Sequence, residues 1–221
     1  MTAEETPASS TEDETTQAQT TTDVTTDATA DSQEAVPATE ALEWHAPVMV
    51  RIDEHTTIPH LLKERVQRGA TRPLILRKIG IGDTWRSITA REFYDEVHAL
   101  AAGLIARGLE PGDRVAIMSR TRYEWTLLDF ACWAAGLVPV PIYETSSIDQ
   151  VAHVLVDADV ALIIAETVSM AEIVRAAAER EGRENTHVLS LDSEAIDTLI
   201  ADGSATPRER VLARSEALTK D

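Results

Sequence analysis

The sequence predicts an α/β fold, an incomplete doubly wound and mainly parallel sheet with helices on both faces. Three observations support this prediction. Apolar runs of about five residues alternate with longer amphipathic segments, the runs are apolar along their whole length, and glycine-containing turns separate many of the segments. Strands that are apolar throughout are typical of a parallel sheet that is covered on both faces.

Charge divides the 221 residues into two parts. The chain has 38 Asp and Glu against 20 Lys and Arg, and residues 1–45 contain 11 of the acidic residues and no Lys or Arg. Thr, Ala and acidic residues dominate this part, which has too few large apolar side chains to offset the entropy cost of ordering. We therefore expect a disordered acidic extension at 1–45, either a solubilising tail or a docking arm, followed by one domain at 46–221.

Composition also excludes several classes of protein. A net charge of -18 argues against a nucleic-acid binder, because a negative surface repels phosphates. Cys132 is the only cysteine, so a disulfide framework is excluded and a reducing, cytoplasmic compartment fits. No apolar run is long enough to span a membrane, and the acidic start is unlike a signal peptide. Contact with a membrane surface stays open, although no basic amphipathic helix suggests it.

The first elements are a helix and a hairpin. Thr57 can cap a short helix that runs to about Arg68, with Pro59 in its first turn, where the missing N–H costs little. Two short apolar runs, 73–79 and 84–88, then flank a Gly/Asp turn and predict a β-hairpin.

The next segments alternate between helix and strand. Each helix is expected to begin at a capping box, in which a Ser or Thr and an acidic or amide residue three positions later bond each other's backbone, or to end at a glycine. After the hairpin, strands are expected at 114–118, 137–143, 160–164 and 187–191. The helices that alternate with them are expected from Thr89 and Glu92 to Gly108, at 123–135, from Ser147 and Gln150 to Ala158, and from Ser169 and Glu172 to Gly182. A last helix is expected at 207–217, opened by Thr206 and Glu209.

Ligands of open α/β sheets bind at the carboxyl ends of the strands. Three loops are expected there, at 119–122, 144–147 and 166–169. The hydroxyl-rich run before Ser147 can hold a phosphate or carboxylate, but the simpler interpretation is helix capping. Arg120 and Arg122 either meet an anion or pair with Glu124 or Asp129.

The remaining candidates give no active site. Gly80 and Gly82 lie in the hairpin turn and lack the third glycine of a dinucleotide site, and no phosphate-binding loop with its lysine is present. His55 and His60 are poorly spaced for a metal, His98 and His153 are most simply helix residues, and Cys132 is most simply a packed thiol. We assign no catalytic, cofactor-binding or metal-binding residue.

Four stretches nevertheless resemble one enzyme family in type and order. They are Thr84–Glu92, Gly108–Ile117, Ser119–Trp125 and Pro139–Ser147 with Gln150. The chain resembles the opening part of the AMP-forming acyl-CoA synthetases, or adenylate-forming enzymes, and within them the bacterial long-chain fatty-acid–CoA ligases. The Gly-Asp-Arg-Val stretch is common to the superfamily, whereas the Pro-Ile-Tyr-Glu-Thr-Ser-Ser run is more specific to the long-chain branch.

The resemblance implies a reaction and its partners. An intact enzyme of this kind joins a fatty acid to coenzyme A through an acyl-adenylate, using ATP and Mg²⁺. The family's phosphate loop, adenine-contacting segment, ribose-binding Asp and catalytic Lys have no counterpart in these 221 residues. We therefore expect an N-terminal fragment that is inactive by itself. Two alternatives remain, an adenylate-forming ligase for a medium-chain, aryl or amino acid and a non-catalytic α/β binding module.

Overall fold

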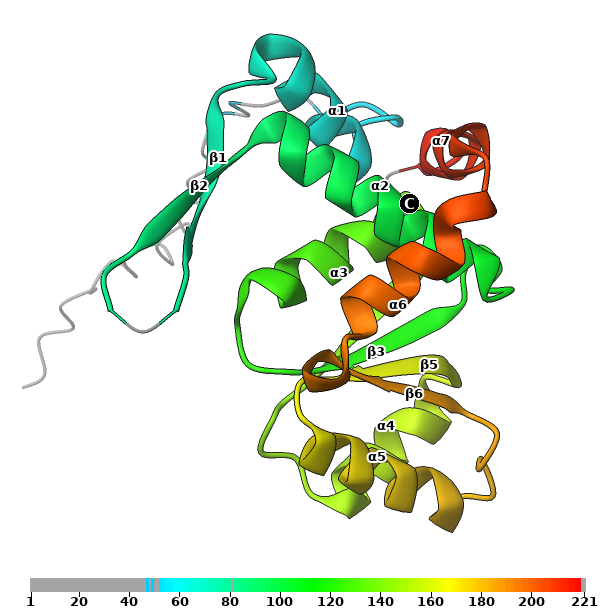
Figure 1. Ribbon diagram of the computed structural model, residues 1–221. Coiled ribbons are helices and arrows are strands. Elements are labelled where there is room, and N and C mark those ends of the chain that lie inside the picture. Colours follow the sequence, from blue (N-terminus) through cyan, green and yellow to red (C-terminus); the bar gives the residue numbers. More distant parts are fainter. Residues whose placement is uncertain (1–46, 48, 50–51, 81, 220–221) are drawn as a thin grey trace, which may run out of the picture. The chain divides into compact units, whose positions relative to one another are not determined.

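Four apolar runs form one parallel sheet, as the sequence predicts. The computed structural model describes Pro47, Met49 and residues 52–80 and 82–219, and the strands of the sheet are β3 (Arg114–Met118), β4 (Val138–Ile142), β5 (Val160–Ala165) and β6 (His187–Ser190) (Figure 1). Their order is β4-β3-β5-β6 and all neighbours are parallel. The expected acidic extension, residues 1–45, lies outside the described residues.

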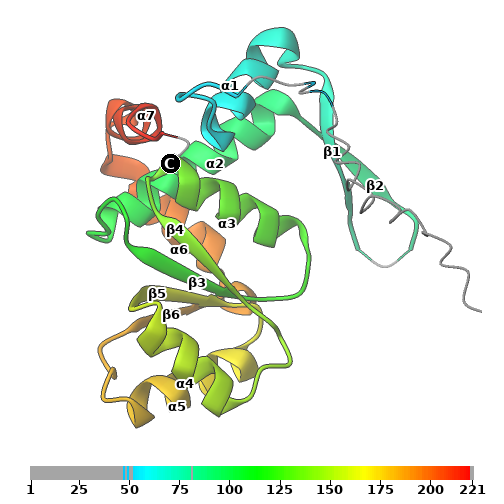
Figure 2. The ribbon, with the colours of Figure 1, turned by 180° about the vertical axis from the view of Figure 1, so that it is seen from behind.

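Helices cover both faces of this sheet. The α-helices of the described residues are α1 (Ile58–Gly69), α2 (Ala90–Ala106), α3 (Tyr123–Ala134), α4 (Ile148–Asp157), α5 (Val168–Arg180), α6 (Ala195–Asp202) and α7 (Arg208–Glu216). Figures 1 and 2 show α4 and α5 on one face and α2, α3 and α6 on the other. The prediction of a doubly wound α/β sheet is confirmed.

The two central strands supply a core on each face, because successive side chains of a strand point in opposite directions. Val115 and Ile117 of β3 belong to the larger core, with side chains of α2, α3 and α6. Ala116 and Met118 belong to the smaller core under α4 and α5. The edge strand β4 is less buried than expected, with Val138 exposed.

The hairpin is a separate antiparallel pair. It consists of β1 (Pro73–Lys78) and β2 (Trp85–Thr89), and its strands project past the end of α2 (Figure 2). Ile88 is buried and Ile75 packs against the larger core, whereas Leu76 and Trp85 are exposed. The predicted hairpin is confirmed, and only its base is anchored in the core.

Three of the predicted helix starts are confirmed. Thr57 caps α1 by accepting a hydrogen bond from the His60 N–H. Thr89 with Glu92, and Ser147 with Gln150, form complete capping boxes at α2 and α4. Each of these signals depends on residues three apart in sequence, so no distant contact is needed to find it.

In the second half of the chain, the structure differs from the sequence prediction in three places. The cap of α5 is Thr167, whose hydroxyl accepts from the Met170 N–H, and not Ser169 with Glu172. The last helix begins at Arg208 after Pro207, without the side-chain cap expected from Thr206 and Glu209. The helix α6 is absent from the predicted elements, because it follows a 3₁₀ turn and a left-handed Glu194 that makes no side-chain cap.

The last helix, α7, packs against the larger core. Val211 of α7 is buried in the larger core. Arg214 donates from Nη1 to the Leu109 carbonyl oxygen at 2.7 Å and to the Ala135 carbonyl oxygen at 3.3 Å. Helix α7 therefore connects the segments that follow α2 and α3.

Within the described part of the chain, no helix is both long and apolar enough to cross a membrane.

Candidate functional site

The carboxyl ends of the four parallel strands meet at one edge of the sheet. Met118 at the end of β3 is in register with Ile142 of β4 and Ala165 of β5, and Ala165 is in register with Ser190 of β6. The three loops that the sequence places at this edge therefore lie next to one another. This is the position at which open α/β sheets bind ligands.

A buried carboxylate organises the edge. Glu166 follows β5 directly, is only 3% exposed, and accepts a hydrogen bond at Oε2 from the Arg120 N–H at 2.9 Å. The Arg120 guanidinium donates from Nη2 to Oε1 at 2.6 Å, and the Ser119 hydroxyl lies 3.3 Å from Oε2. Arg122 adds a longer contact at 3.5 Å. The loop after β3 is thus fixed to the end of β5.

These donors favour the ionised carboxylate. The hydrogen bond from the Arg120 side chain is the main cause that lowers the pKa of Glu166 to about 2, and it outweighs the opposing effect of burial. The charge is therefore present at neutral pH. The same contact raises the pKa of Arg120.

A groove of about 510 Å³ lies beside this charge pair. Its wall combines a cation, hydroxyls, aromatic rings and one acidic residue, namely Ser119, Arg120, Thr121, Trp125, Pro141, Ile142, Tyr143 and Glu144. The Arg120 side chain is 67% exposed although its guanidinium is held by Glu166, and Tyr143 is 81% exposed. A guanidinium has five N–H donors, so Arg120 keeps donors for a ligand.

The sequence offered Glu124 and Asp129 as partners for both Arg120 and Arg122, but the structure gives the two arginines different main partners. Arg122 pairs with Glu124 at 2.6 Å, as one interpretation proposed. Arg120 pairs with Glu166 and with neither Glu124 nor Asp129. Burial without a compensating partner raises the pKa of Asp129 to about 6.

The loop before α4 acts as a helix cap. Ser147 and Gln150 satisfy each other's backbone N–H groups at 2.9 and 3.3 Å, so the capping interpretation is confirmed. Thr167 and Ser169 likewise belong to the start of α5, with their hydroxyls 3.3 Å apart. The side chains of Ser147, Gln150 and Thr167 therefore already accept hydrogen bonds from backbone N–H groups at the helix starts.

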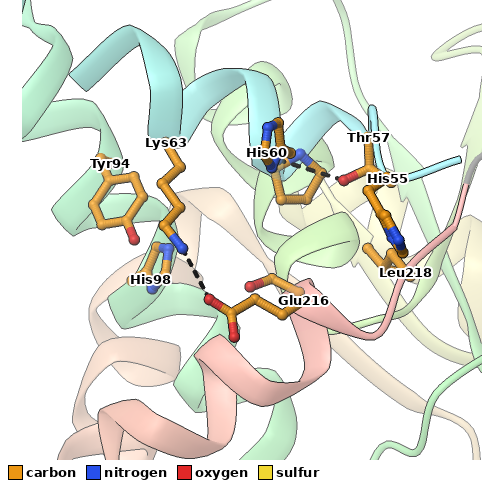
Figure 3. A pocket seen from close by; sticks show the side chains of 10 residues that line it. His55, Thr57, His60, Lys63, Tyr94, His98, Glu216 and Leu218 are labelled. Atoms are coloured by element: carbon orange, nitrogen blue, oxygen red, sulfur yellow. Dashed lines mark hydrogen bonds and ion pairs between the residues drawn. The ribbon is translucent and has the colours of Figure 1, made fainter. Parts of the chain in front are cut away.

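A smaller cavity of about 100 Å³ lies between α1, α2 and α7 (Figure 3). Lys63 reaches across it to Glu216, with 2.8 Å between Nζ and Oε1, beside His98 and Tyr94. Nδ1 of His98 is buried and has no hydrogen-bond partner among the described residues. Burial, followed by the charge of Arg208, lowers the pKa of His98 to about 4.

The other sequence candidates are structural. His55 and His60 also line the small cavity, but in the described ranges no three His, Cys, Asp or Glu side chains are grouped to hold a metal ion. Cys132 is fully buried in the larger core, and burial raises the pKa of its thiol. Gly80 and Gly82 lie in the hairpin turn with positive φ, as expected for a turn.

Glu166 is the residue that sequence reasoning missed. Its loop was expected at the carboxyl edge, but no role was given to its carboxylate. A signal was available, because a charged residue directly follows the apolar run Val160–Ala165. A carboxylate at the end of a buried strand needs a cation close by, and the loop after β3 offers two arginines.

The described residues form an α/β unit with a groove at the carboxyl edge of its parallel sheet, and the comparisons with known proteins specify the family. The family described as "AMP-binding enzyme" matches residues 62–219, so the chain belongs to it. The chain is 37% identical over 181 residues to the long-chain-fatty-acid–CoA ligase FadD15 of Mycobacterium bovis. This match covers 80% of the chain and 29% of that ligase, so the chain spans less than a third of the relative's length.

Solved structures agree with the fold. The N-terminal subdomain of Klebsiella oxytoca NpsA, in complex with 3-hydroxyanthranilyl-AMSN, is 28% identical with a TM-score of 0.50, over 68% of this chain and 32% of that one. VinN in complex with L-aspartate is 20% identical with a TM-score of 0.55, over 76% of this chain and 41% of that one. The expected resemblance to adenylate-forming enzymes is confirmed.

Proposed function

We propose that this chain is part of a long-chain fatty-acid–CoA ligase. The whole enzyme would react a fatty acid with ATP to give an acyl-adenylate and pyrophosphate, and would then transfer the acyl group to coenzyme A with release of AMP. The observation that carries the proposal is the 37% identity to a ligase with this name over 181 residues. The Pro-Ile-Tyr-Glu-Thr-Ser-Ser run, which resembles the long-chain branch, supports the choice of acid.

Within that enzyme, residues 46–221 would serve as scaffold. Glu166 holds the loop of Arg120 at the carboxyl edge, and this contact gives the 510 Å³ groove a fixed cationic wall. Mg²⁺ supplies charge neutralisation when it binds ATP phosphates, but the described residues offer no group of ligands for it. We assign neither ATP, Mg²⁺ nor coenzyme A to particular residues, and we propose that the 221 residues alone do not turn over.

Two experiments test this proposal. In the first, residues 47–219 replace the matched segment of the mycobacterial ligase, and palmitoyl-CoA synthesis is measured with ATP, Mg²⁺ and CoA. We expect the chimera to be active and the isolated 221-residue chain to be inactive. Turnover by the isolated chain would contradict the scaffold role, and a folded chimera without palmitoyl-CoA synthesis would contradict the proposed ligase activity.

The second experiment decides the acid. A panel of palmitate, octanoate, benzoate and an amino acid is given to the full product of the gene that encodes this chain, with pyrophosphate release as the readout. Preference for palmitate supports the long-chain proposal. Preference for another acid would move the protein to a different ligase of the same family, and no release with any acid would favour a non-catalytic binding module.

The proposal also covers location. The single cysteine of this chain fits a cytoplasmic enzyme, and a long-chain substrate would bring that enzyme to membrane surfaces. Its expected partners are small molecules and not nucleic acids. Fractionation of cells that express the tagged gene product tests the location, and secretion into the medium would contradict it.

A further inference from the structure

An apolar groove lies away from the carboxyl edge of the sheet. It has a volume of about 370 Å³ and lies between α1, β1, α2 and α3, lined by Ile58, Leu61, Leu62, Arg65, Leu74, Ile75, Phe93, Thr126 and Phe130. It shares no residue with the carboxyl-edge groove. Its volume is within the range of about 300–1,000 Å³ that is usual for small-molecule sites.

The floor of the groove is closely packed and its rim is exposed. Phe93 and Phe130 pack edge to face with ring centroids 5.2 Å apart, and Leu62 is 6% exposed. Ile58 and Leu61 at the rim remain 40% and 47% exposed. An alkyl chain laid along this surface would remove apolar side chains of both partners from water, which favours binding by about 25 cal/mol per Å².

One cation in the groove, Arg65, has no acidic partner among the described residues. Arg65 donates from Nη1 to the Gly69 carbonyl oxygen and from Nη2 to the Pro73 carbonyl oxygen, both at 3.1 Å. No carboxylate of the described ranges forms an ion pair with it, whereas Arg68 on the same helix pairs with Glu64 at 2.7 Å. The two carbonyls fix the direction of the guanidinium, and its other three N–H groups bond no described residue.

We propose that this groove binds a free fatty acid, with the alkyl chain on the apolar floor and the carboxylate on Arg65. The charge of Arg65 selects a carboxylate over a neutral or cationic amphiphile, because a charge-assisted pair beside an apolar surface is stronger than one in water. The proposal depends on the proposed function only in the choice of an acyl chain as the ligand. The bound molecule would be additional to the one that is activated.

The surroundings of the groove limit the length of alkyl chain that it can take. A second hollow, of about 440 Å³, shares Ile75 and Thr126 with it and continues along the hairpin past Leu76. Past Leu76 its wall is charged, with Arg77, Lys78, Arg122 and Glu124, so an alkyl chain finds apolar side chains there only at Ile75 and Leu76. Binding should therefore strengthen with chain length only until the first groove is filled, and up to that length each further buried CH₂ contributes about 0.8 kcal/mol in transfer free energies, or roughly fourfold in affinity.

Calorimetric titration of the 221-residue chain tests the proposal. The ligands are laurate, dodecanol and dodecyltrimethylammonium, each below its critical micelle concentration. We expect one equivalent of laurate to bind saturably, dodecanol to bind at least about tenfold more weakly, and the cationic amphiphile not to bind. A diazirine-labelled fatty acid should crosslink to peptides from α1, β1 or α3.

Variants separate the charge from the apolar floor. Arg65→Gln should weaken laurate binding about tenfold and leave dodecanol binding unchanged, and Arg65→Lys should keep laurate binding. Leu61→Glu should abolish binding of both ligands. The controls are Arg68→Gln, on the same helix, and Val156→Glu, which is as exposed as Leu61 but lies on α4. Circular dichroism verifies that every variant is folded.

Three outcomes would overturn the proposal. They are no saturable laurate binding, equal binding of laurate and dodecanol with no effect of Arg65→Gln, and crosslinks only outside α1, β1 and α3. Equal binding would mean that the groove takes an apolar segment of protein. Because the readout is binding to this chain and not catalysis, a failed ligase assay would contradict the proposed function without affecting this result.

Discussion

Glu166 at the end of β5 and Arg120 at the end of β3 form a charged pair across the sheet, 2.6 Å apart at Oε1 and Nη2. The carboxylate is almost fully buried, whereas the guanidinium faces the groove. Because the backbone N–H of Arg120 also donates to Glu166, the pair fixes both the side chain and the main chain of the loop. Removing the charge should therefore loosen the loop as well as weaken the fold.

We expect Glu166→Gln to lower the free energy of unfolding by about 1–2 kcal/mol at pH 7, because a neutral amide replaces the acceptor of several charge-assisted bonds and Arg120 is partly screened by water. Urea denaturation measures the change. Glu172→Gln, an exposed change on α5, serves as the control and should have no measurable effect. Equal stability of the two variants would contradict a structural role for the pair.

The contribution of Glu166 should depend on pH in one direction. The pKa of this carboxyl is lowered from 4.5 to about 2 in the folded protein. The unfolded chain therefore takes up the proton first, and the stabilisation is complete above pH 4.5 and is lost as the pH falls toward 2. The difference between the wild type and Glu166→Gln should shrink over that interval, and a constant difference would contradict this assignment.

Contacts between residues that are close in sequence could be predicted, whereas contacts between residues that are distant in sequence could not. Thr89 with Glu92, and Ser147 with Gln150, are three residues apart and were predicted correctly, as were the strands whose apolar runs are fully buried. Glu166 and Arg120 are 46 residues apart, and nothing in the spacing indicates which arginine reaches which carboxylate. Helix α6 was missed for a related reason, since Glu194 begins it with a left-handed backbone and no capping side chain.

Another prediction concerns the contact between α2 and α6. The backbone carbonyl of Leu199 occupies the position where a Cβ on Gly103 would stand. Gly103→Ala should lower the free energy of unfolding by about 1–3 kcal/mol through overpacking, although alanine is a better helix former by about 1 kcal/mol. Thermal denaturation measures the change. Gly69→Ala is the control, because its new methyl group meets only the flexible Arg72 side chain, and a similar loss there would contradict the steric explanation.

A further prediction concerns His98. Burial and the nearby charge of Arg208 lower its pKa to about 4, while Asp95 acts in the opposite direction. Below pH 6.5 the unfolded chain binds a proton at this position and the folded chain does not, so stability should decline as the pH falls from about 6.5 to about 4.

The test is the pH dependence of urea denaturation for two histidine variants. His98→Gln removes the titrating group and should reduce the slope of stability against pH between 4 and 6.5. His153→Gln, an exposed change on α4, should leave the slope as in the wild type. A slope that is the same in all three proteins would show that His98 is not the source.

The last prediction concerns how α7 is held. Arg214 is only 9% exposed on its side chain, and it bonds the carbonyls of Leu109 and Ala135 as well as the Glu110 carboxylate at 2.8 Å. Arg214→Met would keep the apolar stem but leave these two carbonyls without this donor. We expect a loss of about 1–3 kcal/mol in the free energy of unfolding and faster hydrogen exchange throughout α7.

Arg210→Met is the matched control on the same helix. Its guanidinium is half exposed and only reaches Glu110 at 4.0 Å, so the change should cost less than about 1 kcal/mol and leave exchange in α7 unaltered. If hydrogen exchange in α7 were equally slow in Arg214→Met and Arg210→Met, Val211 and its apolar neighbours would be sufficient to hold the helix. Faster exchange in the first variant alone would instead show that the helix is held through the two carbonyls, which belong to the segments just after α2 and α3.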